Sequence, residues 1–351
     1  MKTGSLFRVA LTADLYGPDG KPRYRDLGLS VFEGQPAIRW APFQEHRQEI
    51  DPEQIDDVQG VIVLTPRVTA RSVSRSEKLL AIGRFGVGYD SVDVAACTAA
   101  DVVVFIAAGA VDHSVAEATV GWLLALTHHV LIKDRLVRRG GWEERSRFMG
   151  RELRDRTLGV IGLGGIGQSL VQMLAPFGMR QPLAHDPFVN PTDAQRLGVR
   201  LVGLDELLAT ADFVSLHCPL TEQTRNLIGA RELSLMKPDA YLINTARGGI
   251  VNEDALYQAL QEHRIAGAAL DCFAEEPLLR PHRFGEFDNV LLAPHSIAWT
   301  DELFRDIGRA VCQGMLELSR GRRPRGVVNG EVFEHPSFQR KWARLTSGGA
   351  G

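Results

Sequence analysis

The stretch Gly159-Val160-Ile161-Gly162-Leu163-Gly164-Gly165-Ile166-Gly167 decides the fold of the second half of the chain. It lies between a short run of β-branched residues and a helix-like run, so a strand, a glycine-rich turn and a helix are predicted in that order. Gly162 permits a tight turn, Gly164 lets the backbone approach a pyrophosphate, and Gly167 allows close packing of the helix on the strand. The positive end of the helix then favours the phosphate charge. This context predicts a dinucleotide site.

An acidic residue follows at the distance that such a site requires. Asp186 ends the next expected strand, 19 residues beyond Gly167, close to the ~20 residues expected for the acid that binds the adenosine ribose. A carboxylate there repels a 2′-phosphate, and Pro187 and Phe188 provide no arginine to receive one. The sequence therefore predicts NAD as the cofactor. The alternative is that Asp186 merely begins a turn before Pro187.

Length and composition restrict the possible classes of protein. The chain has 351 residues, which favours two domains over one. Hydrophobic residues make up 44% and charged residues 24%, so the chain can bury sizeable cores. With 40 Lys and Arg against 43 Asp and Glu, the formal net charge is −3. Nucleic acid is not predicted as a partner, because a phosphate backbone requires a basic field.

Cysteine usage and hydropathy indicate a reducing compartment away from membranes. The four cysteines are widely spaced and form no CxxC pair, so neither a disulfide framework nor a metal site is predicted. They are Cys97, Cys218, Cys272 and Cys312. No apolar run reaches the ~18 residues needed to span a bilayer. We therefore expect a cytoplasmic protein with no membrane partner.

Short β-branched runs alternate with helix-like stretches, which predicts an α/β protein with two doubly wound parallel sheets. The expected strands of the first half are Phe7–Thr12, Ala37–Trp40, Gly60–Leu64, Leu79–Ile82 and Val102–Ile106. Those of the second half are Thr157–Ile161, Gln181–Ala184, Phe213–Leu216, Ala240–Asn244, Gly267–Leu270 and Val290–Leu292. One helix is expected over Ser114–Val137, with Ser114 and Glu117 forming a capping box. Another is expected over Asp301–Arg320, followed by a tail that could fold back on the first domain.

Three residues with useful chemistry follow three expected strands, where ligands bind in an open α/β sheet. Arg247 can bind a carboxylate through two parallel hydrogen bonds. The imidazole of His295 can exchange a proton with an alcohol or carbonyl oxygen while a hydride moves elsewhere. Glu276 would orient that imidazole and stabilise its charged form. The alternatives are that Arg247 forms a surface ion pair, that Glu276 is a solvated acid and that His295 is only a hydrogen-bonded histidine. Because all three residues accompany a dinucleotide motif, they predict an active site.

The chain resembles the D-isomer-specific 2-hydroxyacid dehydrogenase family. The likeness is carried, in family order, by residues 84–93, 114–117, 159–167, 216–221, 244–249, 269–273 and 293–295. It implies a Rossmann NAD-binding domain over residues 113–303, inserted into a flavodoxin-like substrate-binding domain made of residues 1–112 and 304–351. It also implies a homodimer that transfers a hydride between NAD and C2 of a small D-2-hydroxy or 2-keto acid.

The resemblance assigns roles to individual residues. Arg247, Glu276 and His295 are implied as catalytic, and Val87 and Gly88 would bind substrate together with Arg247 and His295. The residues implied to bind the cofactor are Gly162, Gly164, Gly165, Ile166, Gly167, Asp186, Cys218, Pro219, Thr245, Ala246, Asp271 and Ser296.

The sequence also departs from the family pattern. Where many relatives read Thr-Pro-Gly-Ala-Asn, this chain has residues 107–111 reading Ala-Ala-Gly-Ala-Val, followed by Asp112 and His113. Trp299 could close the substrate pocket or simply pack, and Arg67 could reach a second anionic group or remain a solvated loop residue. Two other functions fit the same fold: a phosphite-type dehydrogenase, and an NAD(H)-sensing binding protein like the C-terminal-binding-protein corepressors.

Overall fold

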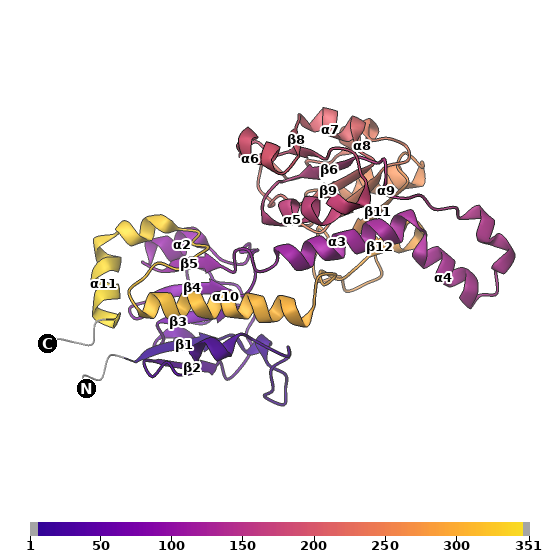
Figure 1. The fold of residues 1–351 in the computed structure, drawn as a ribbon. Coiled ribbons are helices and arrows are strands. Elements are labelled where there is room, and N and C mark those ends of the chain that lie inside the picture. Colours follow the sequence, from indigo (N-terminus) through magenta and orange to yellow (C-terminus); the bar gives the residue numbers. More distant parts are fainter. Residues whose placement is uncertain (1–5, 347–351) are drawn as a thin grey trace. The chain divides into compact units, whose positions relative to one another are not determined.

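In the computed structural model, which describes residues 6–346, the chain divides into two compact units (Figure 1). One unit runs up to Val111 and resumes at Thr300, and the other spans Asp112–Trp299. The first unit is therefore assembled from two segments of the chain, and the second is a single continuous insertion between them.

The first unit contains a five-stranded parallel sheet in the order β2-β1-β3-β4-β5. This is the flavodoxin-like order, as the sequence predicted. Its strands are β1 Phe7–Leu11, β2 Ile38–Pro42, β3 Gly60–Val63, β4 Ala81–Arg84 and β5 Val103–Ile106. Its α-helices are α1 Pro52–Ile55, α2 Val94–Ala99, α10 Asp301–Ser319 and α11 Pro336–Thr346.

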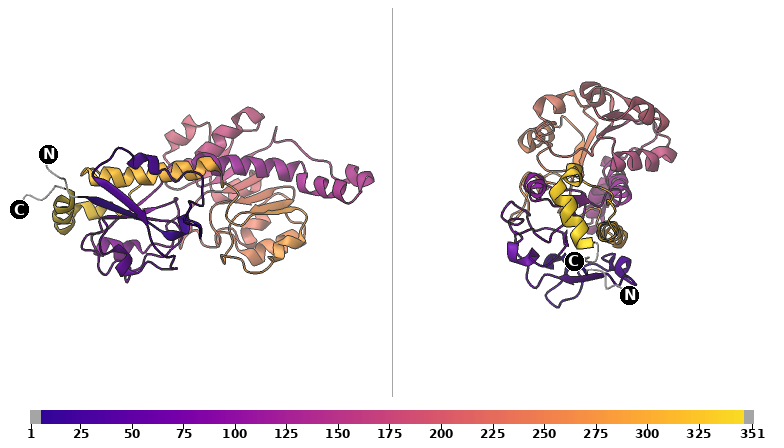
Figure 2. Two further views of the ribbon diagram at one scale, coloured as in Figure 1. Left: turned by 90° about the horizontal axis from the view of Figure 1, so that it is seen from below. Right: turned by 90° about the vertical axis from the view of Figure 1, so that its left-hand side faces the viewer.

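Helix α10, from the second segment, packs on one face of this sheet (Figures 1 and 2). Strands β3 and β4 each have a glycine where they face α10. A Cβ atom at Gly60 would lie 2.5 Å from Sδ of Met315, and one at Gly83 would lie 2.7 Å from Cγ1 of Val311. Close packing of α10 therefore depends on the absence of side chains at these two strand positions.

The expectation that the C-terminal tail folds back on the first unit is confirmed. The Asn329 side chain accepts a hydrogen bond from the backbone N–H of Val104 at 2.7 Å and donates one to the carbonyl of Val102 at 2.9 Å. Phe105 also forms an isolated antiparallel bridge with Val327. The tail thus covers β5, the last strand of the sheet, and satisfies backbone groups that an edge would leave unpaired.

The second unit contains a seven-stranded parallel sheet in the order β12-β11-β10-β9-β6-β7-β8. This is the Rossmann order with one added strand, so the predicted fold class is confirmed. The strands are β6 Leu158–Ile161, β7 Leu183–His185, β8 Arg200–Leu201, β9 Phe213–Leu216, β10 Tyr241–Asn244, β11 Gly267–Leu270 and β12 Val290–Leu292. The helices are α3 Asp112–Thr127, α4 Val130–Arg138, α5 Gly165–Leu174, α6 Pro191–Arg196, α7 Leu204–Thr210, α8 Ala230–Leu235 and α9 Glu253–Gln261.

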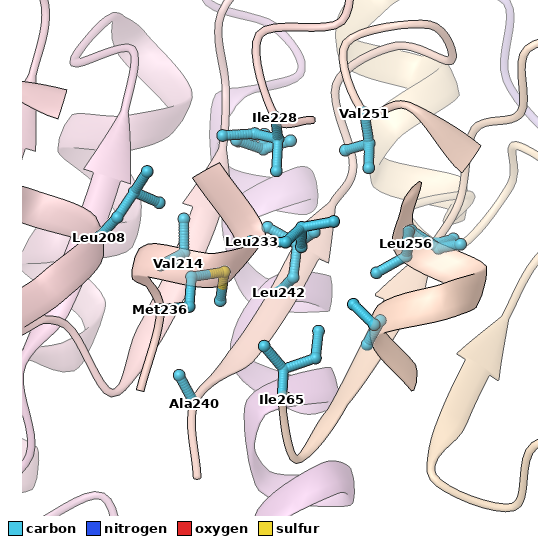
Figure 3. Packing of buried hydrophobic residues seen from close by; sticks show 14 of the residues in the cluster. Leu208, Val214, Ile228, Leu233, Met236, Ala240, Leu242, Val251, Leu256 and Ile265 are labelled. Atoms are coloured by element: carbon cyan, nitrogen blue, oxygen red, sulfur yellow. The ribbon is translucent and has the colours of Figure 1, made fainter. Parts of the chain in front are cut away.

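This sheet has an apolar core on each face because successive side chains of a strand point to opposite sides. Leu242 of β10 packs with Leu233 of α8 and Leu256 of α9 in one cluster (Figure 3). The next residue, Ile243, belongs to the other cluster, which includes Leu123 of α3. All five side chains are at most 1% exposed. The strands are therefore held from both faces, and their carboxyl ends form a firm base for loops.

The single helix predicted over Ser114–Val137 is wrong. The structure has two helices, α3 and α4, and α3 begins at Asp112, so Ser114 lies inside the helix and is no N-cap. The helix ends because the Thr127 carbonyl accepts from the Arg151 N–H and His129 adopts a left-handed conformation with φ of 52°. Among the described residues no single helix is long and apolar enough to span a membrane; α3 and α4, bent by 58°, pass that test of length and composition together.

Candidate active site

The glycine-rich turn joins β6 to α5 in a space that side chains would fill. Gly162 has a φ of +94°, and a Cβ atom there would lie 2.7 Å from the backbone nitrogen of Cys218. A Cβ atom at Gly167 would lie 2.4 Å from the carbonyl oxygen of Gly162. Both positions therefore require glycine, one for the turn and the other for close packing of the helix.

The start of α5 fits a dinucleotide pyrophosphate. Within residues 6–346, no atom outside the neighbouring backbone lies within 4 Å of where a Cβ atom of Gly164 would stand, so the N-cap of this ten-residue helix is open. The amides of a first helical turn have no acceptor within the helix, and they carry the positive end of the helix dipole. The first bond of the helix runs from Gln168 N–H to the Gly164 carbonyl at 2.9 Å. Gly165 and Ile166 thus belong to the turn that would hold the phosphates.

Asp186, directly after β7, lies beside this turn. One carboxylate oxygen accepts a hydrogen bond from the Leu163 N–H at 2.8 Å, and the other accepts one from the Phe188 N–H at 2.9 Å. A carboxylate has about four lone-pair positions, so two remain for ribose hydroxyls. The two amides fix the carboxylate in place and link it directly to the phosphate-binding turn.

The sequence did not reveal that a second acid reaches the same turn. A Cβ atom on Gly165 would lie only 1.8 Å from Oδ2 of Asp112, the first residue of α3. Burial raises the pKa of the Asp112 carboxyl above its usual value. The packing of α3 on α5 brings these residues together, and no local pattern around Asp112 indicates it.

The loops after β10 and β11 touch through their backbones. A Cβ atom at Gly248 would lie 1.7 Å from the carbonyl oxygen of Phe273, so any other residue would push the loops apart. Asn244, which is 1% exposed, holds the first loop: its side chain donates to the Arg247 carbonyl at 2.9 Å and accepts from the Ala246 N–H at 3.0 Å. Asn244 is therefore a positioning residue for Arg247 that sequence reasoning missed.

His295 and Glu276 form the pair that the sequence predicted. Nδ1 of His295 and Oε2 of Glu276 are 2.7 Å apart, and Oε1 of Glu276 accepts from the Phe273 N–H at 2.8 Å. The His295 side chain is 45% exposed, so its ring remains accessible. His295 also has a φ of 54°, a left-handed conformation that is uncommon for residues other than glycine. Such backbone conformations concentrate at functional sites.

The electrostatics favour a charged Glu276. Burial opposes its ionisation, but hydrogen bonds from His295 and the Phe273 amide, with the nearby charge of Arg247, hold the pKa of the carboxyl below its usual value. Glu276 is therefore a carboxylate at neutral pH, able to accept a hydrogen bond from an N–H group of the imidazole and to stabilise positive charge on the ring.

Asp271 anchors the loop that carries His295. It follows β11, is 5% exposed, and one of its carboxylate oxygens accepts from the N–H groups of Ser296 and Ile297 at 2.8 and 3.1 Å. Burial raises the pKa of Asp271 despite these two bonds. Asp271 and Ser296, both expected at the cofactor, are thus joined to each other and to the histidine loop.

The other expected residues lie at strand ends as well. Thr245, 9% exposed, follows β10, and its hydroxyl is 3.5 Å from that of Thr119 on α3. Cys218 and Pro219 come shortly after β9, with the Cys218 amide against Gly162. Val87 and Gly88 belong to the first unit, on the loop after β4.

Comparison with known proteins identifies the family. Residues 120–296 match the family model described as D-isomer specific 2-hydroxyacid dehydrogenase, NAD binding domain. A D-3-phosphoglycerate dehydrogenase of Methanocaldococcus jannaschii is 42% identical over 79% of this chain and 53% of its own length. A glyoxylate reductase of Korarchaeum cryptofilum is 36% identical over 90% of this chain and 96% of its own. The crystal structure of an Aquifex aeolicus D-lactate dehydrogenase with NAD and lactic acid superposes with a TM-score of 0.76, at 28% identity over 89% of this chain and 96% of that one.

The chain therefore belongs to the D-isomer-specific 2-hydroxyacid dehydrogenases, and its inserted unit is the NAD-binding domain. The chain spans about half the length of the D-3-phosphoglycerate dehydrogenases that it matches. The family identifies NAD as the cofactor.

The position of Asp186 predicts the basis of cofactor choice. An Asp186→Ala variant should lose about 10–100-fold in its preference for NADH over NADPH, because hydrogen bonds to a charged group contribute about 1.5–3 kcal/mol and the repulsion of a 2′-phosphate also disappears. Fluorescence titration with both cofactors measures this ratio. An unchanged ratio would show that Asp186 does not contact the ribose.

The buried ring of His217 predicts a pH dependence of stability. Nδ1 of His217 is buried, Nε2 is 2.8 Å from the Ser215 hydroxyl, and burial lowers the pKa of the ring to about 4. Between pH ~6.5 and ~4 the unfolded chain binds a proton that the folded protein does not, so the free energy of unfolding falls as the pH falls through this range. A His217→Asn variant should lose about 3 kcal/mol of that pH dependence in urea titrations. Parallel curves for the two proteins would contradict the assignment.

Proposed function

We propose that the protein transfers a hydride between NAD and C2 of a small D-2-hydroxy acid or 2-keto acid. The observation that carries the proposal is the His295–Glu276 pair, 2.7 Å apart, at the carboxyl edge of an NAD-binding sheet and beside the loop of Arg247. When bound, NAD supplies the hydride acceptor and NADH the donor. The residues of this chain must then bind the acid, orient its C2 group and move one proton.

Each residue has a distinct task in this proposal. Arg247 binds the substrate carboxylate and polarises the neighbouring carbonyl through its fixed charge. His295 donates a proton from Nε2 to the carbonyl oxygen in reduction and removes it from the hydroxyl in oxidation. Glu276 keeps Nδ1 hydrogen-bonded and the ring oriented, and it stabilises the imidazolium. The backbone of Val87 and Gly88 contributes to carboxylate binding, as the resemblance implies.

The surroundings of Arg67 favour a small, unphosphorylated acid. Arg67 is ion-paired with Glu49 at 3.3 Å, and Thr69 also donates to this carboxylate at 3.0 Å. Arg71 also lies 3.7 Å from this carboxylate, and a phosphate at Arg67 would have to compete with Glu49. Among the relatives, the glyoxylate reductase matches over nearly its whole length, unlike the D-3-phosphoglycerate dehydrogenases. A 2-keto acid of the size of glyoxylate or hydroxypyruvate fits these observations.

We also propose that the protein is a homodimer. Helix α4 and the turn after it expose large apolar side chains to solvent: Val130, Val137, Trp142 and Met149 are 53–79% exposed. Figure 1 shows α4 extending away from the sheet of its own unit. Apolar side chains gathered on one segment favour burial against a second chain, and sedimentation velocity measures the mass directly.

The substrate is tested by NADH oxidation against a panel of acids. The panel contains glyoxylate, hydroxypyruvate, pyruvate, longer and branched 2-keto acids and phosphohydroxypyruvate, with an Arg247→Ala variant in parallel. We expect fastest turnover with a small unphosphorylated acid and a large rise in KM for it in the variant, since the carboxylate loses its anchor. Preference for phosphohydroxypyruvate would reject the substrate assignment. Tight NADH binding without any turnover would favour the sensing protein. Reduction of NAD by phosphite, followed in a separate assay, would favour the phosphite-type dehydrogenase.

The proton-transfer roles predict a graded loss of rate. A His295→Ala variant should lose roughly 10²–10⁴ in kcat, the usual contribution of a general acid or base, with NADH affinity unchanged. Glu276→Gln should lose less, because an amide oxygen can still accept a hydrogen bond from Nδ1–H but supplies no charge. His335→Ala is the matched control, since His335 also pairs with a carboxylate, Asp101 at 2.9 Å, in the other unit. Near-normal turnover of His295→Ala would remove His295 from the mechanism.

A further inference from the structure

Cys272 is a nucleophilic side chain at the candidate active site for which the proposed reaction has no use. It directly follows Asp271 at the end of β11, is 3% exposed, and its thiol lies 3.5 Å from the Ala246 carbonyl. The spacing of the cysteines in the sequence gave no indication of a metal site. The fold, however, brings Sγ of Cys272, a carboxylate oxygen of Glu276 and a ring nitrogen of His295 within 4.8 Å of one another.

Each of these three atoms is of a type that binds zinc in proteins. Thiolate, imidazole and carboxylate bind Zn²⁺ at ~2.0–2.3 Å, so tetrahedral ligands stand about 3.5 Å apart. No pair of donors, all within 4.8 Å of one another, therefore needs to close by more than about 1.3 Å to surround one cation. Binding releases the proton of the Cys272 thiol. The resulting thiolate and the Glu276 carboxylate balance the two charges of the ion, so the nearby charge of Arg247 meets a neutral centre.

The three ligands stand on a fixed frame. Glu276 is held by the Phe273 amide at 2.8 Å, and the loop of His295 is held by the two hydrogen bonds to Asp271. Cys272 is fixed by burial and by its contact with Ala246. Restraint of this kind raises metal affinity, because little ordering remains to be done on binding. The exposed side of His295 offers a path for entry.

We propose that Cys272, Glu276 and His295 bind one thiophilic divalent cation of the zinc class, and that this cation inhibits the enzyme. A cation on Nδ1 replaces the hydrogen bond by which Glu276 holds the imidazole, and it leaves the fourth coordination position to water or to the substrate carboxylate. The inhibitory consequence rests on the proposed function, whereas cation binding does not.

Binding is tested on the purified protein without substrate. Addition of Co²⁺ should give a thiolate-to-cobalt charge-transfer band that saturates at one ion per chain, and Zn²⁺ should abolish the band by competition. Cys272→Ala and Cys272→Ser should both lose the band, and their Zn²⁺ affinity should fall by more than the ~10–100-fold typical for loss of an outer-shell partner. Two variants are used so that a folding defect in one does not decide the result.

Cys97→Ala is the matched control, because Cys97 is equally buried but lies on α2 of the other unit. It should keep the band. Absence of the band in the parent protein, or its persistence in both Cys272 variants, would overturn the cation site.

Inhibition is tested by measuring NADH oxidation with the acid of the panel that the parent protein reduces fastest. Zn²⁺ should inhibit the parent and the Cys97→Ala protein reversibly, with activity restored by a chelator, while Cys272→Ala should turn over at the parental rate with or without Zn²⁺. Equal inhibition of Cys272→Ala would reject the inhibitory site. If the parent protein turns over none of the acids, the proposed function fails, and the cobalt spectrum still decides whether the cation site exists.

Discussion

The parallel pairing of the seven strands from β6 to β12 determines where chemistry can occur in the inserted unit. Because all of these strands point the same way, every loop that follows a strand leaves from one edge of the sheet. The hydrogen-bonded order then makes β10, β11 and β12 neighbours, so the loops carrying Arg247, Glu276 and His295 become neighbours too. Arg247 and His295 are 48 positions apart in the sequence. They share one site because their strands are neighbours in the sheet.

Close contact between the backbones of neighbouring loops is the second constraint on the inserted unit. It requires glycine at particular positions, and these positions could be predicted from the sequence. The turn at Gly162 requires glycine because the backbone of Cys218 lies against it, and that requirement produces a recognisable spacing with Gly167. Asp186 was predicted for a similar reason, since its distance from the glycines follows from the length of one strand–helix–strand unit. The parallel sheets and the His295–Glu276 pair followed from the same regular geometry.

The features that could not be predicted depend on contacts between distant segments. Nothing near Asp112 indicates that its carboxylate packs on Gly165, since that contact exists only because α3 lies on α5. The end of α3 depends on the Arg151 amide, which comes from more than twenty residues further along the chain. Strand β8 has only two residues and leaves no periodic pattern. Cys272 becomes a neighbour of His295 through sheet order alone, so the spacing of cysteines carried no information about it.

The division of the first unit into two segments affects the order in which the protein can fold. During synthesis, Asp112–Trp299 emerges from the ribosome ahead of α10, which begins at Asp301. The strands from β1 to β5 therefore emerge without the helix that packs over Gly60 and Gly83, and without the Asn329 side chain that binds the backbone of β5. The inserted unit has all of its own strands and helices by then. The NAD-binding domain can thus complete its core first, while the N-terminal sheet keeps one apolar face uncovered until α10 has emerged.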